Sequence, residues 1–91
     1  MHLIKLTPTA AKAFNSLHPQ AKKDIKSALK ILSEKPYAGK ELQNELRLFR
    51  SFKIKRYRAI YSVDENSNTI VIIAIGHRQD IYDLAGKLTK K

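Results

Sequence analysis

The segment from Ser51 to Tyr61, SFKIKRYRAIY, places four cationic side chains within six residues: Lys53, Lys55, Arg56 and Arg58. No Asp or Glu occurs from Leu46 to Val63 to balance them. Buried charges need partners, so this cluster predicts an anionic ligand outside the chain, whether nucleic acid, an acidic protein or an anionic membrane. Because the planar guanidinium of arginine binds phosphate oxygens through two parallel hydrogen bonds, the segment is a candidate phosphate-binding element.

A β-hairpin with Lys55 and Arg56 as its two central residues would place Lys53 directly across from Arg58. Like charges that face each other across two strands are unfavourable by a few tenths to about 1 kcal/mol. An anion bound between them would reverse that sign. Since exposed side chains also splay into water, the pair alone does not establish a site.

A second stretch, GHRQDIY, follows an apolar strand near the C-terminus. In three consecutive antiparallel strands the end of the third lies near the start of the second, so we expect Arg78 close to Arg58 and Lys53. His77 is a candidate for proton transfer near neutral pH, Arg78 for clamping phosphate, and Tyr82 for stacking on a base or donating a proton. The expected convergence of these residues with the basic hairpin indicates a site.

The elements that position these residues are read from hydrophobic periodicity. In the first half we expect a short strand over residues 2–6, a helix that opens at Thr7 and Pro8, and a second helix that opens at Pro19 and ends at Pro36. The connecting segment YAGKELQN is predicted to be a loop.

The second half has strand periodicity. We expect one strand on which Leu46, Leu48, Phe52 and Ile54 share a side, a second over Tyr57–Val63, and a third over Thr69–Ile75 that is apolar on both sides and therefore central. A short C-terminal helix or tail follows. The predicted class is α+β: a short N-terminal strand and a two-helix hairpin packed on an antiparallel sheet, in the order β-α-α-β-β-β.

Composition predicts the class of protein. The 91 residues, 1–91, indicate a single domain, and 18 Lys and Arg against 8 Asp and Glu give a net charge of +10. The chain has no cysteine, which favours a cytoplasmic protein, and its longest apolar run, Ile70–Ile75, is too short to cross a membrane. The three histidines, at 2, 18 and 77, show no metal-ligand spacing, so we expect neither a metal nor another cofactor.

The run GKELQNELRLFRSFKIKRYRAIY, followed by an apolar strand and GHRQDIY, resembles the RelE/ParE superfamily of bacterial and archaeal toxins. The resemblance covers nearly the whole chain and rests on the order and spacing of these motifs. It implies a small α+β fold like that of microbial ribonucleases. It also implies one of two activities: the RelE branch cleaves messenger RNA in the ribosomal A site, and the ParE branch poisons DNA gyrase. In both branches an antitoxin wraps around the toxin.

The resemblance carries over residue by residue. Arg58, in Tyr-Arg-x-Ile-Tyr, matches the central active-site arginine of RelE-like nucleases, Arg78 the arginine that closes the site, and Tyr82 the terminal tyrosine. Lys53 matches the second basic residue of the preceding strand, but Ser51 stands where the first is expected. The stretch from Arg50 to Phe52 also resembles ParE, which keeps gyrase poisoning as an alternative.

Cleavage of RNA by its 2′-hydroxyl needs a base, cations that stabilise the phosphorane, and an acid for the leaving oxygen. Arg58 and Arg78 are candidates for charge stabilisation and Lys53 for proton exchange, whereas His77, Tyr82 and Glu45 compete for the roles of base and acid. Contacts to RNA are assigned to the other four cations of the segment 47–58, which are Arg47, Arg50, Lys55 and Arg56. We therefore favour a ribosome-dependent mRNA endonuclease, with a gyrase poison or a non-catalytic nucleic-acid-binding or antitoxin-binding domain as alternatives. The expected partner is an antitoxin that is acidic or contains an amphipathic helix.

Overall fold

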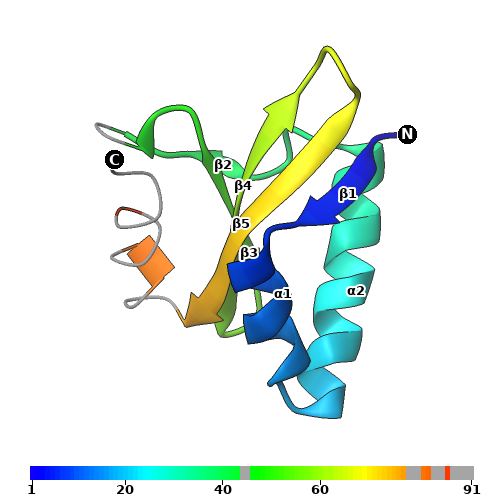
Figure 1. Cartoon of the computed structure of the whole chain (residues 1–91), viewed down its shortest axis with the longest axis vertical. Helices are drawn as coiled ribbons and strands as arrows, with labels where there is room; N and C mark the ends of the chain where they lie inside the picture. Colours follow the sequence, from blue (N-terminus) through cyan, green and yellow to red (C-terminus); the bar gives the residue numbers. More distant parts are fainter. Residues whose placement is uncertain (44–45, 78–80, 83–85, 87–91) are drawn as a thin grey trace.

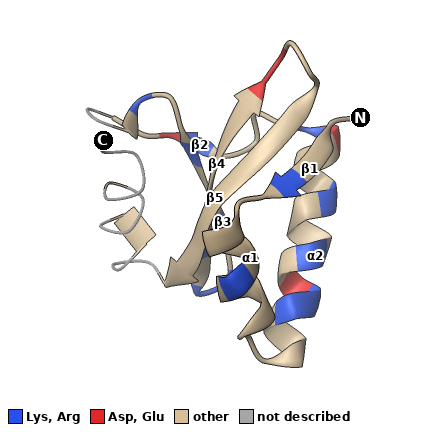
Figure 2. Ribbon diagram, in the orientation of Figure 1, with Lys and Arg blue, Asp and Glu red and all other residues tan. Residues whose placement is uncertain are grey.

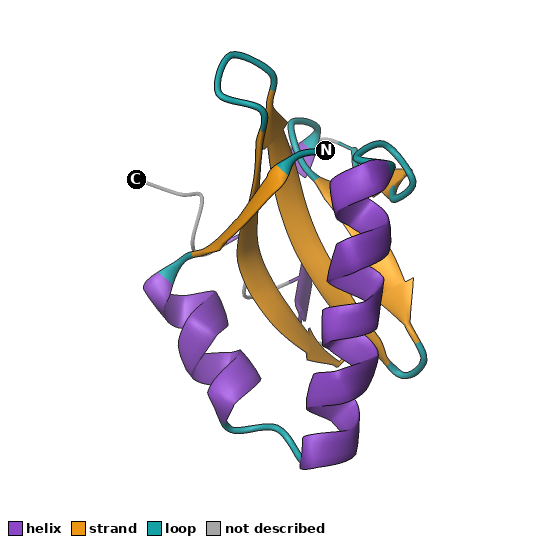
Figure 3. Cartoon of the chain, turned by 90° about the vertical axis from the view of Figure 1, so that its right-hand side faces the viewer, coloured by secondary structure: helices purple, strands orange, loops and turns teal. Residues whose placement is uncertain are grey.

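A computed structural model describes residues 1–43, 46–77, 81–82 and 86 (Figure 1). This part of the chain contains five strands and two helices, in the order β1 (Leu3–Leu6), α1 (Pro8–Asn15), α2 (Pro19–Glu34), β2 (Lys40–Glu41), β3 (Arg50–Ile54), β4 (Tyr57–Asp64) and β5 (Thr69–His77). Both helices lie on one side of the sheet, which we call the helix face, and the opposite side is the second face (Figure 3). The predicted α+β class is confirmed.

Both helices begin where predicted, and each has a side-chain cap. The Oγ1 atom of Thr7 accepts a hydrogen bond from the backbone N–H of Ala10 at 3.2 Å, and Nδ1 of His18 accepts one from the N–H of Gln20 at 3.2 Å. A proline follows each cap, at the position where a missing N–H costs nothing. Basic residues line the outer side of α2 (Figure 2). Within the described ranges, neither helix has the length and apolar character needed to span a membrane.

The sheet has the strand order β1-β5-β4-β3-β2. The three C-terminal strands pair antiparallel, as predicted, and β5 lies between β1 and β4 in the interior of the sheet. The N-terminal strand β1 joins β5 in parallel, so the sheet is mixed. Burial of β5 on both sides explains its nearly continuous apolar sequence.

The segment that precedes β3 differs from the prediction. The strand begins at Arg50, because residues 46–49 form a tight turn in which the N–H of Phe49 donates to the carbonyl of Leu46 at 2.9 Å. The expected common side is therefore wrong: Leu46 packs in a cluster on the second face, Leu48 is 78% exposed, and Phe52 and Ile54 pack in the main core. The predicted loop also contains a short strand, β2, which pairs with β3 and forms one edge of the sheet.

A bulge in β5 sets the alternation of side chains at the end that carries the candidate site. Ile60 pairs with Ala74, but the next residue, Tyr61, pairs with Ile72, so Ile73 is an extra residue in β5. A bulge of this kind shifts the side chains beyond it to the other face of the sheet. Ala74 therefore packs with Ile60 on the second face, and Gly76 comes opposite Arg58.

The side chain of Tyr61 attaches the loop after α2 to the sheet. Tyr61 is fully buried, and its hydroxyl donates a hydrogen bond to the carbonyl of Pro36 at 2.8 Å and accepts one from the N–H of Gly39 at 2.9 Å. Gly39 has no room for a side chain, since a Cβ atom there would lie 2.5 Å from the Tyr61 hydroxyl oxygen. This contact therefore fixes the path of the chain into β2.

Replacing Tyr61 with Phe is expected to lower the free energy of unfolding by about 1 to 3 kcal/mol, because the buried N–H of Gly39 and the partly buried carbonyl of Pro36 lose their partner. Urea denaturation monitored by circular dichroism measures the change. The matched control is Tyr57→Phe, whose hydroxyl makes no hydrogen bond within the described residues and whose loss should change stability by less than about 0.5 kcal/mol. Equal stability of the two variants would contradict the role assigned to Tyr61.

Burial of Tyr61 raises the pKa of its phenol above the ordinary value. As the pH rises, the unfolded chain therefore loses this proton first. The contribution of Tyr61 is complete below about pH 10 and is lost as the pH rises from there through the folded-state pKa. A hydrogen bond with Glu65 also raises the pKa of Tyr37. Tyr37 is present in both the wild type and the Tyr61→Phe variant, so its titration cancels when their stabilities are compared. The stability difference between wild type and Tyr61→Phe should thus shrink above about pH 10, and a difference that is constant up to pH 11 would refute this.

Candidate functional site

A cavity of about 390 Å³ lies on the second face of the sheet and is lined by Lys40, Ser51, Lys53, Arg58 and Tyr82. Three of these residues, Lys53, Arg58 and Tyr82, were predicted from the sequence to lie together, and the structure brings them together. The predicted hairpin is also confirmed, because Lys53 pairs with Arg58 in the register of β3 and β4. The size lies within the range of about 300 to 1,000 Å³ that is usual for small-ligand sites.

The C-terminal segment reaches the cavity through an apolar anchor. Ile81 is 1% exposed and packs with Ile60 and Ala74 on the second face. The next residue, Tyr82, has its hydroxyl 3.2 Å from the Oγ atom of the buried Ser51, within hydrogen-bonding distance. The apolar contact thus sets where the segment lies on the sheet, and the hydroxyl pair orients the tyrosine at the cavity.

The lining is electrostatically one-sided. Lys40, Lys53 and Arg58 are cations, and no carboxylate belongs to the described residues that line the cavity. One guanidinium nitrogen of Arg58 donates to the carbonyl of Tyr57 at 3.3 Å. On the other side of β4, the partner of Arg58 on β5 is Gly76, which has no side chain to place beside the cavity. Three cations around one space repel each other and attract an anion, so the cavity is suited to a phosphate group.

Two lining residues, Lys40 and Ser51, were not among the predicted site residues. Lys40 lies on β2, in the segment expected to be a loop, and pairs with Ser51 across β2 and β3. A two-residue strand is too short to produce a periodic pattern, so the sequence offered only the presence of a lysine next to Gly39. Ser51 was noted as a departure from the family pattern, and the structure places a cation, Lys40, directly across from it.

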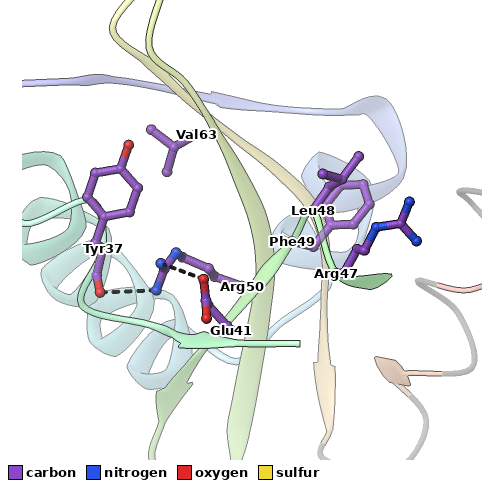
Figure 4. Close-up of a pocket in the computed structure, with 7 residues that line it drawn as sticks. All are labelled: Tyr37, Glu41, Arg47, Leu48, Phe49, Arg50 and Val63. Carbon is purple, nitrogen blue, oxygen red and sulfur yellow. Dashed lines mark hydrogen bonds and ion pairs between the residues drawn. The ribbon is translucent and has the colours of Figure 1, made fainter. Parts of the chain in front are cut away.

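Arg50 lies away from this cavity and is bound to the protein itself. Its Nη1 donates to the carbonyls of Gly39 at 2.8 Å and Tyr37 at 3.3 Å, its Nη2 lies 3.4 Å from a carboxylate oxygen of Glu41, and its guanidinium lies 4.9 Å from the Tyr37 ring centroid. Figure 4 shows this arrangement in a second pocket, of about 220 Å³. Arg50 thus holds the loop before β2 against the sheet, and its predicted contact with RNA stays a prediction.

Arg47 also lines the second pocket, and its guanidinium points away from Arg50 (Figure 4). Lys55 and Arg56 form the predicted turn between β3 and β4. Lys55 has a φ of 55°, a conformation that costs energy for a residue with a side chain, and its Nζ lies 3.3 Å from a carboxylate oxygen of Asp24 on α2. Contacts of these three cations with RNA stay predictions.

Of the remaining predicted site residues, only His77 falls within the described part of the chain. It ends β5, and its ring lies beside that of Tyr57, with 4.8 Å between the ring centroids. Within the described residues it does not line the cavity. Tyr57 pairs with His77, and the next residue, Arg58, pairs with Gly76. Because neighbouring residues of a strand point to opposite faces and Arg58 lies on the second face, Tyr57 and His77 lie on the helix face. Arg78 and Glu45 lie outside the described residues.

Comparisons with known proteins find similar sequences and similar folds. A sequence model of the family described as ParE toxin of type II toxin-antitoxin system, parDE, matches residues 4–82. The toxin RelG of Mycobacterium tuberculosis is 32% identical over 83 residues, which cover 89% of this chain and 95% of RelG. A chain in the crystal structure of the M. tuberculosis toxin-antitoxin complex RelBE2 matches with a TM-score of 0.77 and 30% identity, over 85% of this chain and 98% of its own. The isolated E. coli RelE toxin has the same fold, with a TM-score of 0.75 and 21% identity over 99% of this chain and 100% of its own.

The contact between Ser51 and Tyr82 can be measured by a double-mutant cycle. Ser51→Ala, Tyr82→Phe and the double variant should show a coupling free energy of about 0.5 to 1.5 kcal/mol in urea denaturation, because each single variant removes the same hydrogen bond. The control cycle combines Ser51→Ala with Tyr57→Phe, whose side chain lies on the other face, and should be additive. Additivity in both cycles would show that Ser51 does not hold Tyr82.

Proposed function

Because the chain belongs to the RelE/ParE superfamily of type II toxin–antitoxin toxins, we propose that it is a ribosome-dependent endoribonuclease that cleaves messenger RNA. The observation that carries this proposal is the cavity in which Lys53, Arg58 and Tyr82 meet. A nuclease needs such a convergence of phosphate-binding cations with a group that can stack on a base or transfer a proton. A domain that only binds nucleic acid needs the positive charge alone.

The proposed reaction is attack by the ribose 2′-oxygen on the adjacent phosphorus. The 2′-oxygen loses its proton to a base and forms a bond to phosphorus, the bond from phosphorus to the 5′-oxygen breaks, and that oxygen gains a proton from an acid. The products are a 2′,3′-cyclic phosphate and a free 5′-hydroxyl. Negative charge accumulates on the phosphate oxygens in the transition state, and preorganised cations stabilise it at that stage. Arg58 is assigned this role, and Lys53, which faces it across β3 and β4, is assigned proton exchange.

Tyr82 is assigned contact with the substrate, by stacking on a base or by donating a proton from its hydroxyl. Its hydroxyl is held by Ser51, and this contact limits the positions of the ring. His77 is a weaker candidate for the proton transfers, because its ring lies against Tyr57 and it does not line the cavity within the described residues. Arg78 keeps the role that the resemblance implies, as the arginine that closes the site, and Glu45 stays a candidate base.

Gyrase poisoning is the second candidate function, because the matching family model is that of the ParE toxins. The two functions predict different damage. A ParE-like toxin would cause double-strand breaks in DNA, whereas a RelE-like toxin would cause loss of intact mRNA in cells that are translating. The cavity favours the nuclease because its Lys53, Arg58 and Tyr82 are dispensable for a protein that acts by binding gyrase.

We further propose that a cognate antitoxin neutralises the protein in the cytoplasm. This is supported by the solved structures that the chain resembles, several of which are toxin–antitoxin complexes. The net charge of +10 favours an antitoxin segment that is rich in Asp and Glu or forms an amphipathic helix. Such a segment would cover the basic residues between Arg47 and Arg58.

Replacing Arg58 with Ala should leave the fold intact, because the side chain is only half-buried, and should slow cleavage of ribosome-bound mRNA by roughly 10²- to 10³-fold. The measurement is single-turnover cleavage on programmed ribosomes with the toxin in excess. Lys26→Ala is the charge-matched control, because Lys26 is an exposed residue of α2 on the helix side of the sheet. This control should cleave like wild type.

Two results would count against the nuclease. One is full cleavage by a folded Arg58→Ala variant. The other is intact mRNA together with double-strand DNA breaks in cells that express the wild type, which would favour the gyrase poison. Urea denaturation of Arg58→Ala and of Lys26→Ala shows whether any loss of cleavage by these variants comes from unfolding.

A further inference from the structure

Lys40 is an edge-strand lysine that lines the cavity. It lies on β2, at one edge of the sheet, and its direct partner across the strands is Ser51. Residues that lie opposite each other on antiparallel strands direct their side chains to the same face. Lys40 therefore shares the second face with Ser51, and it lines the cavity with Lys53, Arg58 and Tyr82.

No acid among the described residues compensates the charge of Lys40. Within the described residues its side chain forms no ion pair and no hydrogen bond. The adjacent acid, Glu41, points to the other side of the strand, where Arg50 lies 3.4 Å from its carboxylate. The protein thus pairs the neighbouring acid with a different cation and leaves Lys40 beside the cationic Lys53 and Arg58.

A third cation in this position has an electrostatic consequence. Each added positive charge at the cavity makes the empty site less favourable and the site filled by an anion more favourable. A phosphodiester that spans the cavity from Arg58 on β4 past Lys53 on β3 reaches the edge strand β2, which carries Lys40. Each of the three strands thus contributes one cation to the cavity: Lys53 lies directly across from Arg58, and Lys40 is diagonal to Lys53, because its direct partner on β3 is Ser51.

A lysine on a short edge strand also has a simpler role, which is to prevent pairing with other chains. The same sheet provides an example for comparison. Lys5 is an exposed residue of β1, the opposite edge strand, and it is not among the residues that line the cavity. Lys5 and Lys40 are thus both exposed lysines on edge strands, and they differ in that only Lys40 lines the cavity.

We propose that Lys40 binds a backbone phosphate of the RNA substrate and is a third functional cation of the site, next to Lys53 and Arg58. This inference rests on the proposed nuclease function and assigns the substrate contact of one further residue. The contact is a charge-assisted hydrogen bond between the ammonium group and a phosphate oxygen. It requires the positive charge itself, and a neutral side chain of the same size cannot replace it.

The chain has no cysteine, which allows the charge at position 40 to be removed and restored in one protein. In Lys40→Cys the new thiol is the sole reactive sulfhydryl. Alkylation with 2-bromoethylamine converts it into an aminoethyl-cysteine with the length and charge of lysine, and alkylation with iodoacetamide gives a neutral adduct. Lys5→Cys, treated in the same two ways, is the matched control.

Two readouts are needed: binding of a short single-stranded RNA at several salt concentrations, and single-turnover cleavage of ribosome-bound mRNA. Lys40→Cys should weaken RNA binding or cleavage at subsaturating toxin by about 10- to 100-fold, the range for one charge-assisted hydrogen bond. The slope of log affinity against log salt should become shallower by about 0.7 to 1. Aminoethylation should restore both quantities, and the neutral adduct should restore neither. The Lys5→Cys proteins should resemble wild type.

The inference is wrong if Lys40→Cys matches Lys5→Cys in affinity and salt dependence, or if the neutral adduct restores binding as well as the aminoethyl adduct does. These results are distinct from failure of the proposed function. If wild type cleaves mRNA while Lys40→Cys behaves like the control, the nuclease stands and the contact of Lys40 is refuted. If wild type cleaves nothing while RNA binding still depends on the charge at position 40, the nuclease is refuted and the phosphate contact stands.

Discussion

The pairing of Lys53 with Arg58 across β3 and β4 is the constraint on which the candidate site depends. Two like charges opposite each other cost a few tenths to about 1 kcal/mol, so this pair does not hold the hairpin together. The hairpin is held by the helix face, where Phe52, Ile54 and Ala59 pack in the main core. A slip of one residue in the register would send these apolar side chains into water and the cations into the core. Burial of apolar side chains on the helix face thus keeps Lys53 and Arg58 opposite each other on the second face, despite the repulsion between their charges.

The edge of the site is held by polar contacts on the helix side of the sheet. Tyr61 binds the loop after α2 through its hydroxyl, and Arg50 binds the same loop through two carbonyls and the carboxylate of Glu41. The loop leads directly into β2, so these contacts determine where Lys40 lies. Arg50 therefore has a structural role, whereas Lys53 and Arg58 of the same basic segment line the cavity.

Fold and function are separate questions in this superfamily. RelE-like and ParE-like toxins share one α+β scaffold, and a scaffold does not specify the reaction. The proposal of a nuclease rests on the side chains of the second face, because cleavage of RNA needs cations and a proton-transferring group around one phosphate. In this chain those side chains come from three adjacent strands and from a C-terminal segment held by Ile81. The proposed activity therefore depends on how segments far apart in the sequence meet.

The sequence by itself determined the features that depend on neighbouring residues. The starts of both helices, the hairpin turn at Lys55 and Arg56, and the pairing of Lys53 with Arg58 follow from local spacing and turn chemistry, and the structure confirms them. The approach of Tyr82 to the basic hairpin was also predicted, because the order of three antiparallel strands brings their ends together.

Only the tertiary structure decided the features that depend on distant partners. The short strand β2 exists because it pairs with β3, so nothing in its own two residues indicates a strand or the contribution of Lys40 to the cavity. The bulge at Ile73 changes which face each residue of β5 occupies, a change that simple alternation cannot anticipate. The binding of Arg50 to a loop eleven to thirteen residues earlier in the chain likewise has no periodic signature. Local pattern thus predicts the two helices and the longer strands, whereas register and long-range hydrogen bonds decide which side chains meet.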